Sequence, residues 1–536
     1  MTSDLNGFVK ISCNYPGGNV KVHGISTGCA DVDADLRDTP SNWFYWNFEA
    51  EAVTPGTVRF QFPVGRWMIS RQGPAVSTDE GKTWHWLGRE NTTFNGSESK
   101  VNTRDSFDWT FTRAGETVRF AQGIPYLLKD FEEYYSTVRN SPYLKRSVLT
   151  ISRQGRELPL LTIGNGPENM LLTARHHCCE AMASYALEGF VAEALSDSPA
   201  AVEFRSRYTL YVVPFMDLDG AEAGDQGKNR APHDQNRDYG LVNPIYPENK
   251  AVMALHAEKK FKLVLDLHDP AVRYDAHEML YFGGFSTSSN RANTREFKAW
   301  VDEELPEEIN PILYRHPEKD NIPPVTLPIA GDMGIPSSLY FTIVPDIVYG
   351  TTVEIPYATV NGRYNEKSSR KIGQAFLRAV LKTDFRKDGE PRTGYKEYLT
   401  FCATAGAADM ERNDIPEHYR ISAMLNVAEK TADLALCEKV MASPVAMTQQ
   451  KYRAAGIKTA ILAGMPDLAP WIEEMKQRDL LATPAVRALP AELASNLNEF
   501  SREIYNIIPK EPGTYEENET VSDKSSVDGG RTAFRS

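Results

Sequence analysis

A histidine and a carboxylate three residues apart are the first residues in this chain whose spacing suits chemistry. His177 and Glu180 follow an apolar run at 171–174 and precede a helical pattern at 181–195. At such a strand-to-helix turn both side chains can converge on one cation, and zinc accepts mixed nitrogen and oxygen ligands. His268 closes another apolar run, typical of a buried parallel strand. We therefore predict one zinc ion per chain, held by His177, Glu180 and His268.

Further motifs follow in a fixed order between residues 177 and 354. They are His177-x-x-Glu180, Val213-Pro214-x-x-Asp217-x-Asp219-Gly220, Asp234-Gln235-Asn236-Arg237 and Thr351-Thr352-Val353-Glu354. With His268 among them, this order resembles the zinc carboxypeptidases, and most closely their cytosolic branch. Each motif is short, but the shared order is specific. The resemblance implies a His-Glu-His zinc site and a peptidase that removes C-terminal residues.

Neighbouring residues compete with this ligand set. His176 stands four residues before Glu180, which is also a helical spacing, but the family pattern places its ligand three residues before the glutamate. Cys178 and Cys179 stand where cytosolic members usually carry Pro-Gly. Thiolates can bind zinc, but adjacent side chains on a turn diverge, and a helix start more often buries such thiols. We therefore expect His177 to be the ligand.

The resemblance also assigns roles to two carboxylates. Glu354 matches the catalytic glutamate, which would take the proton of a zinc-activated water and pass it to the departing amine. Pro356 follows directly, consistent with a strand end at the rim of a site. Asp234 matches a carboxylate that accepts the second ring N–H of the first histidine ligand. Glu354 is therefore the predicted general base, and Asp234 the predicted support of His177.

The remaining implied roles concern substrate binding. Arg237, aided by Asn236, resembles the family's clamp for a terminal carboxylate, because a planar guanidinium matches that group with two parallel bonds. Arg230 is the candidate for the arginine that stabilises the oxyanion, although its spacing to Asn236 is shorter than in the family. Either Tyr340 or Tyr349 would close over the substrate, and Tyr340 is the candidate that we retain.

Charge bears on the side-chain preference. In the family the floor of the side-chain pocket precedes the catalytic glutamate, here residues 331–353. That window holds Asp332 and Asp346 and no lysine or arginine. Members that trim polyglutamate use a basic residue to neutralise an acidic side chain, so the sequence disfavours a preference for glutamate.

Composition narrows the class of protein. The chain has 536 residues and a formal net charge of −13, with a sequence pI near 5.4, which disfavours nucleic acid and anionic membranes as partners. No apolar run reaches the length of a membrane span, and the first residues lack a secretion-signal pattern. Six cysteines without framework spacing favour reduced thiols. A cytoplasmic location is the expectation.

The pattern of strands and helices must position these residues. Short alternating runs separated by Gly, Pro and Asn predict a β-sandwich over residues 1–123. Strands alternating with helices over 124–385 predict an α/β catalytic domain with a mostly parallel, mixed sheet. Such sheets bind ligands beyond the carboxyl ends of their strands. Residues 386–511 are expected to be a helical extension, and the polar residues 512–536 a disordered tail.

These features together predict a zinc-dependent carboxypeptidase. It would hydrolyse the last peptide or isopeptide bond of a peptide whose terminal carboxylate is free, and a homo-oligomer is left open. Two alternatives remain at this stage. One is an amidohydrolase on the same scaffold, acting on N-acyl amino acids or cell-wall peptides. The other is a binding protein with an inactive peptidase core, although a pure binder has no need of Glu354 beside a metal.

Overall fold

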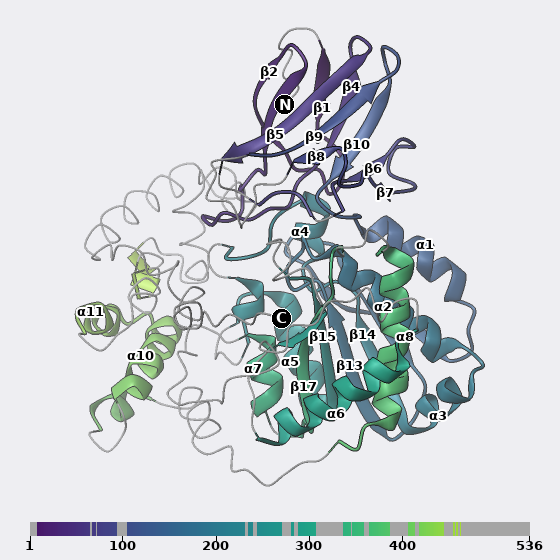
Figure 1. Ribbon diagram of the computed structural model, residues 1–536. Helices are drawn as coiled ribbons and strands as arrows, with labels where there is room; N and C mark the ends of the chain where they lie inside the picture. The colour runs from purple at the N-terminus through teal and green to yellow at the C-terminus, as the bar shows by residue number, and fades with distance from the viewer. Residues whose placement is uncertain are drawn as a thin grey trace, which may run out of the picture.

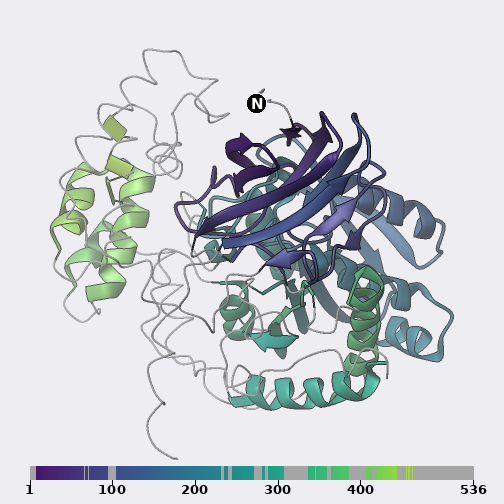
Figure 2. The same ribbon diagram turned by 45° about the horizontal axis from the view of Figure 1, so that its top comes forward.

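The computed structural model combines a strand-rich N-terminal part with an α/β part and further helices (Figure 1). It describes residues 8–64, 67–70, 72–93, 104–230, 234–239, 244–270, 280–283, 288–306, 336–344, 346–358, 364–385, 406–412, 417–443, 454–455, 457–458 and 461–462. The N-terminal strands stack against the α/β part near α4 (Leu218–Ala223) (Figure 1), and Figure 2 shows them from above.

The N-terminal strands form two five-stranded sheets, β1-β4-β10-β6-β7 and β2-β3-β5-β9-β8. Aromatic rings fill the space between them, since Phe60 of the second sheet contacts Phe48 and Phe120 of the first at centroid distances of 5.4 and 5.1 Å. This is the predicted β-sandwich, while its boundary at residue 123 stays a prediction. Its strands are β1 (Val9–Ser12), β2 (Lys21–Ser26), β3 (Cys29–Asp33), β4 (Asn47–Ala52), β5 (Gly56–Val64), β6 (Ala75–Ser77), β7 (His85–Trp86), β8 (Thr92–Thr93), β9 (Arg104–Phe111) and β10 (Thr117–Ala121).

A seven-stranded sheet of order β11-β12-β14-β13-β15-β17-β16 forms the centre of the α/β part. Its four strands β14, β13, β15 and β17 run parallel, whereas the remaining pairings are antiparallel. The predicted mixed sheet with a parallel centre is thereby confirmed. The strands are β11 (Leu144–Ile151), β12 (Glu157–Ile163), β13 (Glu168–Ala174), β14 (Tyr208–Val213), β15 (Leu263–His268), β16 (Tyr281–Gly283) and β17 (Tyr349–Glu354).

Helices cover both faces of this sheet, because side chains alternate along each strand. On β13, Met170 and Leu172 belong to the core that holds α2 (Ala181–Leu195) and α8 (Glu366–Lys382). Leu171 between them faces the second core, with α5 (Pro247–Lys259) and α7 (Ser337–Ile343). The near-continuous apolar sequence of β13 thus reflects burial on two sides.

Two glycines let α2 and α8 lie side by side (Figures 1 and 2). A Cβ on Gly373 would lie 1.8 Å from the carbonyl oxygen of Ala186, and one on Gly189 would lie 1.9 Å from that of Arg370. Both distances are far below contact, so only glycine allows the backbones to approach this closely. The close packing fixes α2, whose first turn follows Glu180.

Between β14 and α5 the described residues form α4 and the short 3₁₀ helix η1 (Gln235–Arg237). In the predicted helical extension, residues 417–442 form two helices, while residues 463–511 lie outside the described residues. The other helices are α1 (Leu128–Val138), α3 (Pro199–Arg207), α6 (Ser288–Glu304), η5 (Ala407–Glu411), α10 (Glu417–Thr431) and α11 (Leu434–Ala442). No described helix is long and apolar enough to cross a membrane.

Candidate metal centre

Three neighbouring parallel strands bring the candidate residues to one edge of the sheet. His177 and Glu180 follow β13, His268 ends β15 and Glu354 ends β17. His268 and Glu354 are register partners across the β15–β17 pair. The carboxyl ends of parallel strands meet at the same edge, so residues far apart in sequence become neighbours here.

The turn after β13 positions the first two candidate ligands, His177 and Glu180. Arg175 adopts a left-handed backbone conformation with φ of 66°, which redirects the chain as it leaves the strand. Its buried guanidinium holds the turn, with Nε donating to the carbonyl oxygen of Cys178 at 2.9 Å and Nη1 to that of Tyr126 at 2.8 Å. His177 and Glu180 are thereby held in one tight turn at the start of α2.

His177, Glu180 and His268 form a buried group whose ligand atoms all lie within 4.8 Å of one another. His177 Nδ1 lies 2.8 Å from Glu180 Oε1, and His268 Nδ1 lies 2.8 Å from Glu180 Oε2. A buried carboxylate with one imidazole nitrogen 2.8 Å from each of its two oxygens fits the donor set and geometry of a zinc site.

The electrostatics of this group favour a cation. Burial alone would raise the pKa of Glu180, but His177, Lys228 and His268 outweigh it and hold that pKa well below its usual range. Burial would lower the pKa of both imidazoles, yet Glu180 and the second carboxylate facing each ring raise the pKa of His177 and of His268. The same negative field that holds protons here attracts a dication.

Asp234 stands behind His177, as the motif predicted. Its Oδ1 lies 3.2 Å from His177 Nε2, so the ring can donate Nε2–H to the carboxylate and present Nδ1 to Glu180. Asp234 also begins η1 and accepts from the backbone N–H of Asn236 at 2.8 Å. Burial would raise its pKa, but His177 and Arg237 hold that pKa well below the usual range.

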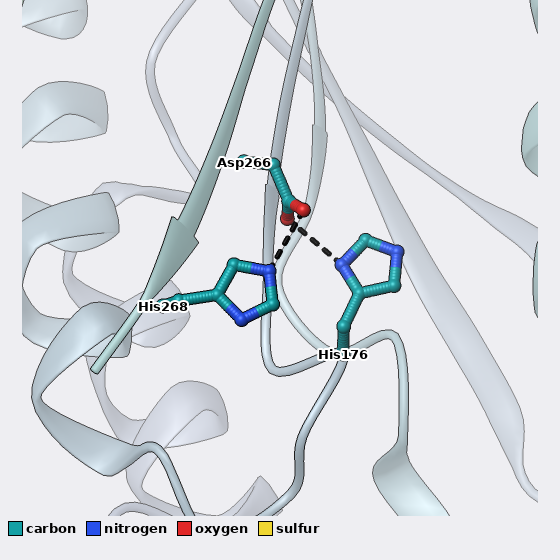
Figure 3. Close-up of side chains that lie close together, drawn as sticks. All are labelled: His176, Asp266 and His268. Carbon is teal, nitrogen blue, oxygen red and sulfur yellow. Dashed lines mark hydrogen bonds and ion pairs between the residues drawn. The ribbon is translucent and has the colours of Figure 1, made fainter. Parts of the chain in front are cut away.

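A second buried carboxylate, Asp266, stands behind His268 (Figure 3). His268 Nε2 and His176 Nδ1 lie 2.8 Å from its two oxygens, from opposite sides. The hydroxyls of Thr173 and Ser337 donate to the same carboxylate. His268 thus repeats the arrangement of His177, with Nε2 on a supporting carboxylate and Nδ1 towards Glu180.

His176 completes this chain of hydrogen bonds. Its Nε2 lies 2.6 Å from the hydroxyl of Tyr239, so Nδ1–H donates to Asp266 while Nε2 accepts from Tyr239. Burial lowers the pKa of His176, which keeps its imidazole neutral and suits this tautomer. His176, Asp266 and His268 could by proximity hold a metal of their own. Because four donors already saturate Asp266, a supporting role for His268 fits the contacts better.

Glu354 lies beside the group at the end of β17. Its Oε2 is buried without a hydrogen-bond partner among the described residues. Burial and the neighbouring Glu180 raise the pKa of Glu354, and His268 and Lys228 oppose that rise. A carboxylate of raised pKa facing a cation site has the properties of a general base.

Arg237 presents a cation to solvent next to Asp234. Its side chain is exposed, and no described carboxylate lies within ion-pair distance of its guanidinium. Asn236 beside it is buried, and its Oδ1 accepts from the backbone N–H of Ser337 at 3.1 Å. Arg237 is therefore open to an external carboxylate, while Asn236 joins η1 to the start of α7.

Arg230 is placed differently from the prediction that it stabilises an oxyanion. Its guanidinium is 4% exposed and faces three carboxylates, at 2.7 Å from Asp217, 3.0 Å from Asp225 and 3.4 Å from Asp38. These ion pairs occupy the donors that a transition state would need. Arg230 closes a buried network between the two parts of the protein, and we withdraw the catalytic assignment.

Lys228 is the cation that sequence reasoning missed. Its Nζ lies 2.5 Å from Glu180 Oε1, and the side chain is almost fully buried. Burial would lower the pKa of Lys228, but Glu180, Cys179 and Glu354 outweigh it and raise that pKa. A charged ammonium therefore lies against a candidate metal ligand and interacts electrostatically with the candidate base.

The tyrosines are also arranged differently from expectation. Tyr340 is buried and its ring packs on Tyr239 at a centroid distance of 5.3 Å, while Tyr349 stacks on Phe385 at 5.1 Å. Both are core positions, and neither contact favours a side chain that closes over substrate. Tyr357 also has a buried hydroxyl without a described partner; burial raises the pKa of Tyr357, and Glu180 and Glu354 add to the rise.

The two adjacent cysteines are buried thiols. Cys178 Sγ donates to the carbonyl oxygen of Asp225 at 3.1 Å, and neither cysteine belongs to a metal-capable group of the described residues. Burial raises the pKa of Cys178 and of Cys179, so the thiolate form is disfavoured. This agrees with the expectation that they pack and do not bind metal.

Of the three residues that sequence reasoning missed, only Asp266 has a signal in the sequence. Asp266 precedes His268 by two positions, so the alternation of a strand places both on one face. A search for carboxylates at that spacing could have found it. Lys228 and Tyr357 carry no such signal, because their places depend on contacts with Trp43 and Phe44, which lie between β3 and β4.

A family model described as zinc carboxypeptidase matches residues 132–326. This range includes His177, Glu180, Asp234 and His268, and ends before Glu354. Among solved structures, a metallo-carboxypeptidase from Pseudomonas aeruginosa in complex with (2-guanidinoethylmercapto)succinic acid aligns with a TM-score of 0.56 at 20% identity, over 70% of this chain and 100% of that one. At this identity the likeness shows the fold, which is of the carboxypeptidase type.

Curated relatives carry the name of the cytosolic branch. Mouse cytosolic carboxypeptidase 3 is 27% identical over 255 residues, which cover 42% of this chain and 25% of the mouse protein. Cytosolic carboxypeptidase 2 of Xenopus tropicalis is 30% identical over 308 residues, or 48% of this chain and 31% of the frog protein. The chain thus spans a quarter to a third of the length of these relatives. The resemblance that the motifs indicated is confirmed, because residues 132–326 match the zinc carboxypeptidase model and part of the chain is similar to the cytosolic carboxypeptidases.

Proposed function

We propose that the protein is a zinc-dependent carboxypeptidase that hydrolyses the C-terminal peptide or isopeptide bond of a peptide. The observation that carries the proposal is the meeting of His177, Glu180 and His268 in one buried group, with Glu354 at the adjacent strand end. Metal ligands and a base at one sheet edge are what hydrolysis by an activated water requires. A cytoplasmic location is part of the proposal.

His177, Glu180 and His268 would hold the zinc, and Asp234 and Asp266 would orient the two imidazoles. When bound, zinc supplies a Lewis acid that polarises the scissile carbonyl and makes water more acidic. Glu354 takes the proton of the attacking water on its buried Oε2 and delivers it to the departing amine. The raised pKa of Glu354 suits both halves of this transfer.

Arg237 and Lys228 bind two different negative charges, the terminal carboxylate of the substrate and the oxyanion of the transition state. The exposed guanidinium of Arg237 binds the terminal carboxylate with two parallel hydrogen bonds, and Asn236 keeps η1 in place beneath it. Lys228 supplies the positive charge for the oxyanion that develops at the scissile carbonyl, because its ammonium lies 2.5 Å from Glu180 and interacts electrostatically with Glu354. Lys228 thus takes the role that the sequence suggested for Arg230.

A matched pair of peptides tests the proposal. The two peptides differ only in whether the C-terminus is a free carboxylate or an amide, and zinc-loaded protein is assayed on both by mass spectrometry. Release of the last residue from the free peptide, with the amidated one cut at least about a hundredfold more slowly, is the expected result. Equal cleavage of the two peptides eliminates the carboxylate clamp.

The same assay separates the rival functions. An N-acyl amino acid is included as a third substrate, and Glu354→Gln protein serves as the control for contaminating peptidases. Deacylation without peptide cleavage would assign the protein to the amidohydrolases. If neither the wild type nor the Glu354→Gln protein turns over any of the three substrates with zinc bound, a binding protein is favoured.

A further inference from the structure

The loop that carries Lys228 is held by the N-terminal strands as well as by the α/β part. Asp38 accepts two backbone hydrogen bonds from this loop, from the N–H of Gln226 at 3.0 Å and of Gly227 at 2.8 Å. Both carboxylate oxygens are used, and Asp38 is 2% exposed. A buried carboxylate that accepts successive backbone N–H groups fixes the path of the chain at that point.

A second contact joins the same loop to the N-terminal part, and here a side chain of the loop bonds the backbone of the N-terminal part. The side-chain amide of Gln226 bonds both backbone groups of Tyr45, its Oε1 accepting from the N–H and its Nε2 donating to the carbonyl oxygen, each at 2.8 Å. Gln226 is fully buried. Residues 38–45, which lie between β3 and β4, therefore hold the backbone of this loop through Asp38 and the side chain of Gln226 through Tyr45.

Two further residues of the same segment, Trp43 and Phe44, contact Lys228 and Tyr357. The ring of Trp43 lies under the Lys228 ammonium, with Nζ 5.1 Å from the ring centroid, and its indole N–H donates to Asn229 Oδ1 at 3.1 Å. Phe44 meets the ring of Tyr357 edge to face at 5.9 Å. Trp43 and Phe44 thus contact the two polar residues beside Glu354 that sequence reasoning did not identify.

We propose that residues 38–45, the segment between β3 and β4, form a wall of the active site, with Trp43 as the positioning residue for Lys228. The proposal rests on the proposed function for its catalytic consequence. A lysine side chain has four rotatable bonds and loses much conformational freedom when it is held in one place. The face of an aromatic ring attracts an ammonium without using its N–H groups, so those that do not bond Glu180 stay open to a developing oxyanion.

Three variants of zinc-loaded, full-length protein test the role of Trp43. Trp43→Leu removes the ring face, Trp43→Phe keeps it, and Trp84→Leu removes another half-buried indole, which bonds Gly81 within its own hairpin. We expect Trp43→Leu to lower kcat about tenfold with KM changed by less than about threefold, because Lys228 acts on the transition state. Trp43→Phe should stay within about threefold of the wild type, and Trp84→Leu should not differ from it.

Two kinetic results would overturn the assignment. One is a Trp43→Leu protein with the kcat of the wild type. The other is a Trp43→Phe protein as impaired as Trp43→Leu, because a purely structural role of the indole would not distinguish the two in this way. Thermal unfolding of all three variants is measured in parallel, so that a loss of folded protein is not counted as a loss of kcat.

Hydrogen exchange supplies a readout that does not need activity. In Asp38→Asn protein, the peptide covering residues 224–230 should exchange faster than in the wild type, because Gln226 and Gly227 lose their charged acceptor. If the wild type hydrolyses no peptide, the proposed function fails, and the wall is judged by this exchange alone. Unchanged protection of residues 224–230 would overturn it.

Discussion

His268 and Glu354 face each other as register partners at the ends of two parallel strands, β15 and β17. One places a nitrogen 2.8 Å from Glu180 Oε2, and the other holds a buried carboxylate oxygen that has no described partner. This pairing places the base next to a candidate ligand through the backbone hydrogen bonds of the sheet. The sheet itself therefore aligns the candidate metal ligand His268 with the candidate base Glu354.

The first prediction concerns that base. Glu354→Gln keeps the shape of the side chain and removes its ability to accept a proton from water. We expect kcat to fall by a factor of about 10²–10⁴, with zinc content unchanged, because Glu354 is not one of the three proposed ligands. Steady-state kinetics and metal analysis on the same preparation measure both quantities. A variant with normal turnover would refute the mechanism.

The second prediction concerns Asp266. Asp266→Asn replaces one of two acceptor oxygens with a donor, so His268 or His176 loses its acceptor. We expect zinc affinity to fall about 10- to 100-fold, measured by competition with a chromogenic chelator. Glu188→Gln is the matched control, since Glu188 is an equally buried carboxylate that bonds Tyr126 and Arg370. Equal zinc affinities of the two variants would show that Asp266 does not support His268.

The third prediction contrasts two buried cations of one loop. Lys228→Met should lower kcat by a factor of about 10²–10³, the usual cost of losing a group that stabilises an oxyanion. Arg230→Met should instead lower the free energy of unfolding by about 3–5 kcal/mol, because it leaves Asp38, Asp217 and Asp225 without their shared partner. Urea unfolding and kinetics are measured on both. The reverse pattern would restore Arg230 as the oxyanion-binding residue.

The fourth prediction is a dependence of stability on pH. Glu248 lies in the first turn of α5 and is 4% exposed, and burial raises its pKa to about 8, with Asp217 adding to the shift. In the unfolded chain the pKa of a glutamate is about 4.3, so the folded state binds the proton more tightly between these values. The free energy of unfolding therefore falls as pH rises through this window, by at most about 1.4 kcal/mol per pH unit.

Glu248→Gln isolates this effect, because glutamine mimics the protonated carboxyl at every pH. The stability of the wild type relative to this variant should decline between pH 6 and pH 8, as measured by urea unfolding at several pH values. A difference that stays constant over that range would show that Glu248 is ionised in the folded protein at neutral pH.

Much of this architecture could be predicted from the sequence. The runs that form β13 and β15 are largely apolar, as buried parallel strands are, and residues at the carboxyl ends of neighbouring parallel strands had to lie close together. That reasoning, joined to the motif order, brought together His177, Glu180, His268 and Asp234. The position of Tyr340 was not predicted, because its packing on Tyr239 depends on how α7 folds back over the sheet.

The cations show where sequence reasoning ends. Arg230 and Lys228 are two residues apart in one polar loop, and no local pattern distinguishes them. Asp38, about 190 residues earlier in the sequence, makes one of them structural, while Trp43 and Glu180 hold the other at the site. Contacts across that separation are set by the docking of the N-terminal strands, which neither propensity nor spacing encodes.

The central claim is that His177, Glu180 and His268 hold one zinc ion, and metal analysis after exhaustive dialysis tests it most directly. The wild type should retain about one zinc per chain, and His177→Ala, with two ligands left, should retain almost none. His177→Ala protein that keeps a full equivalent of zinc would contradict the claim.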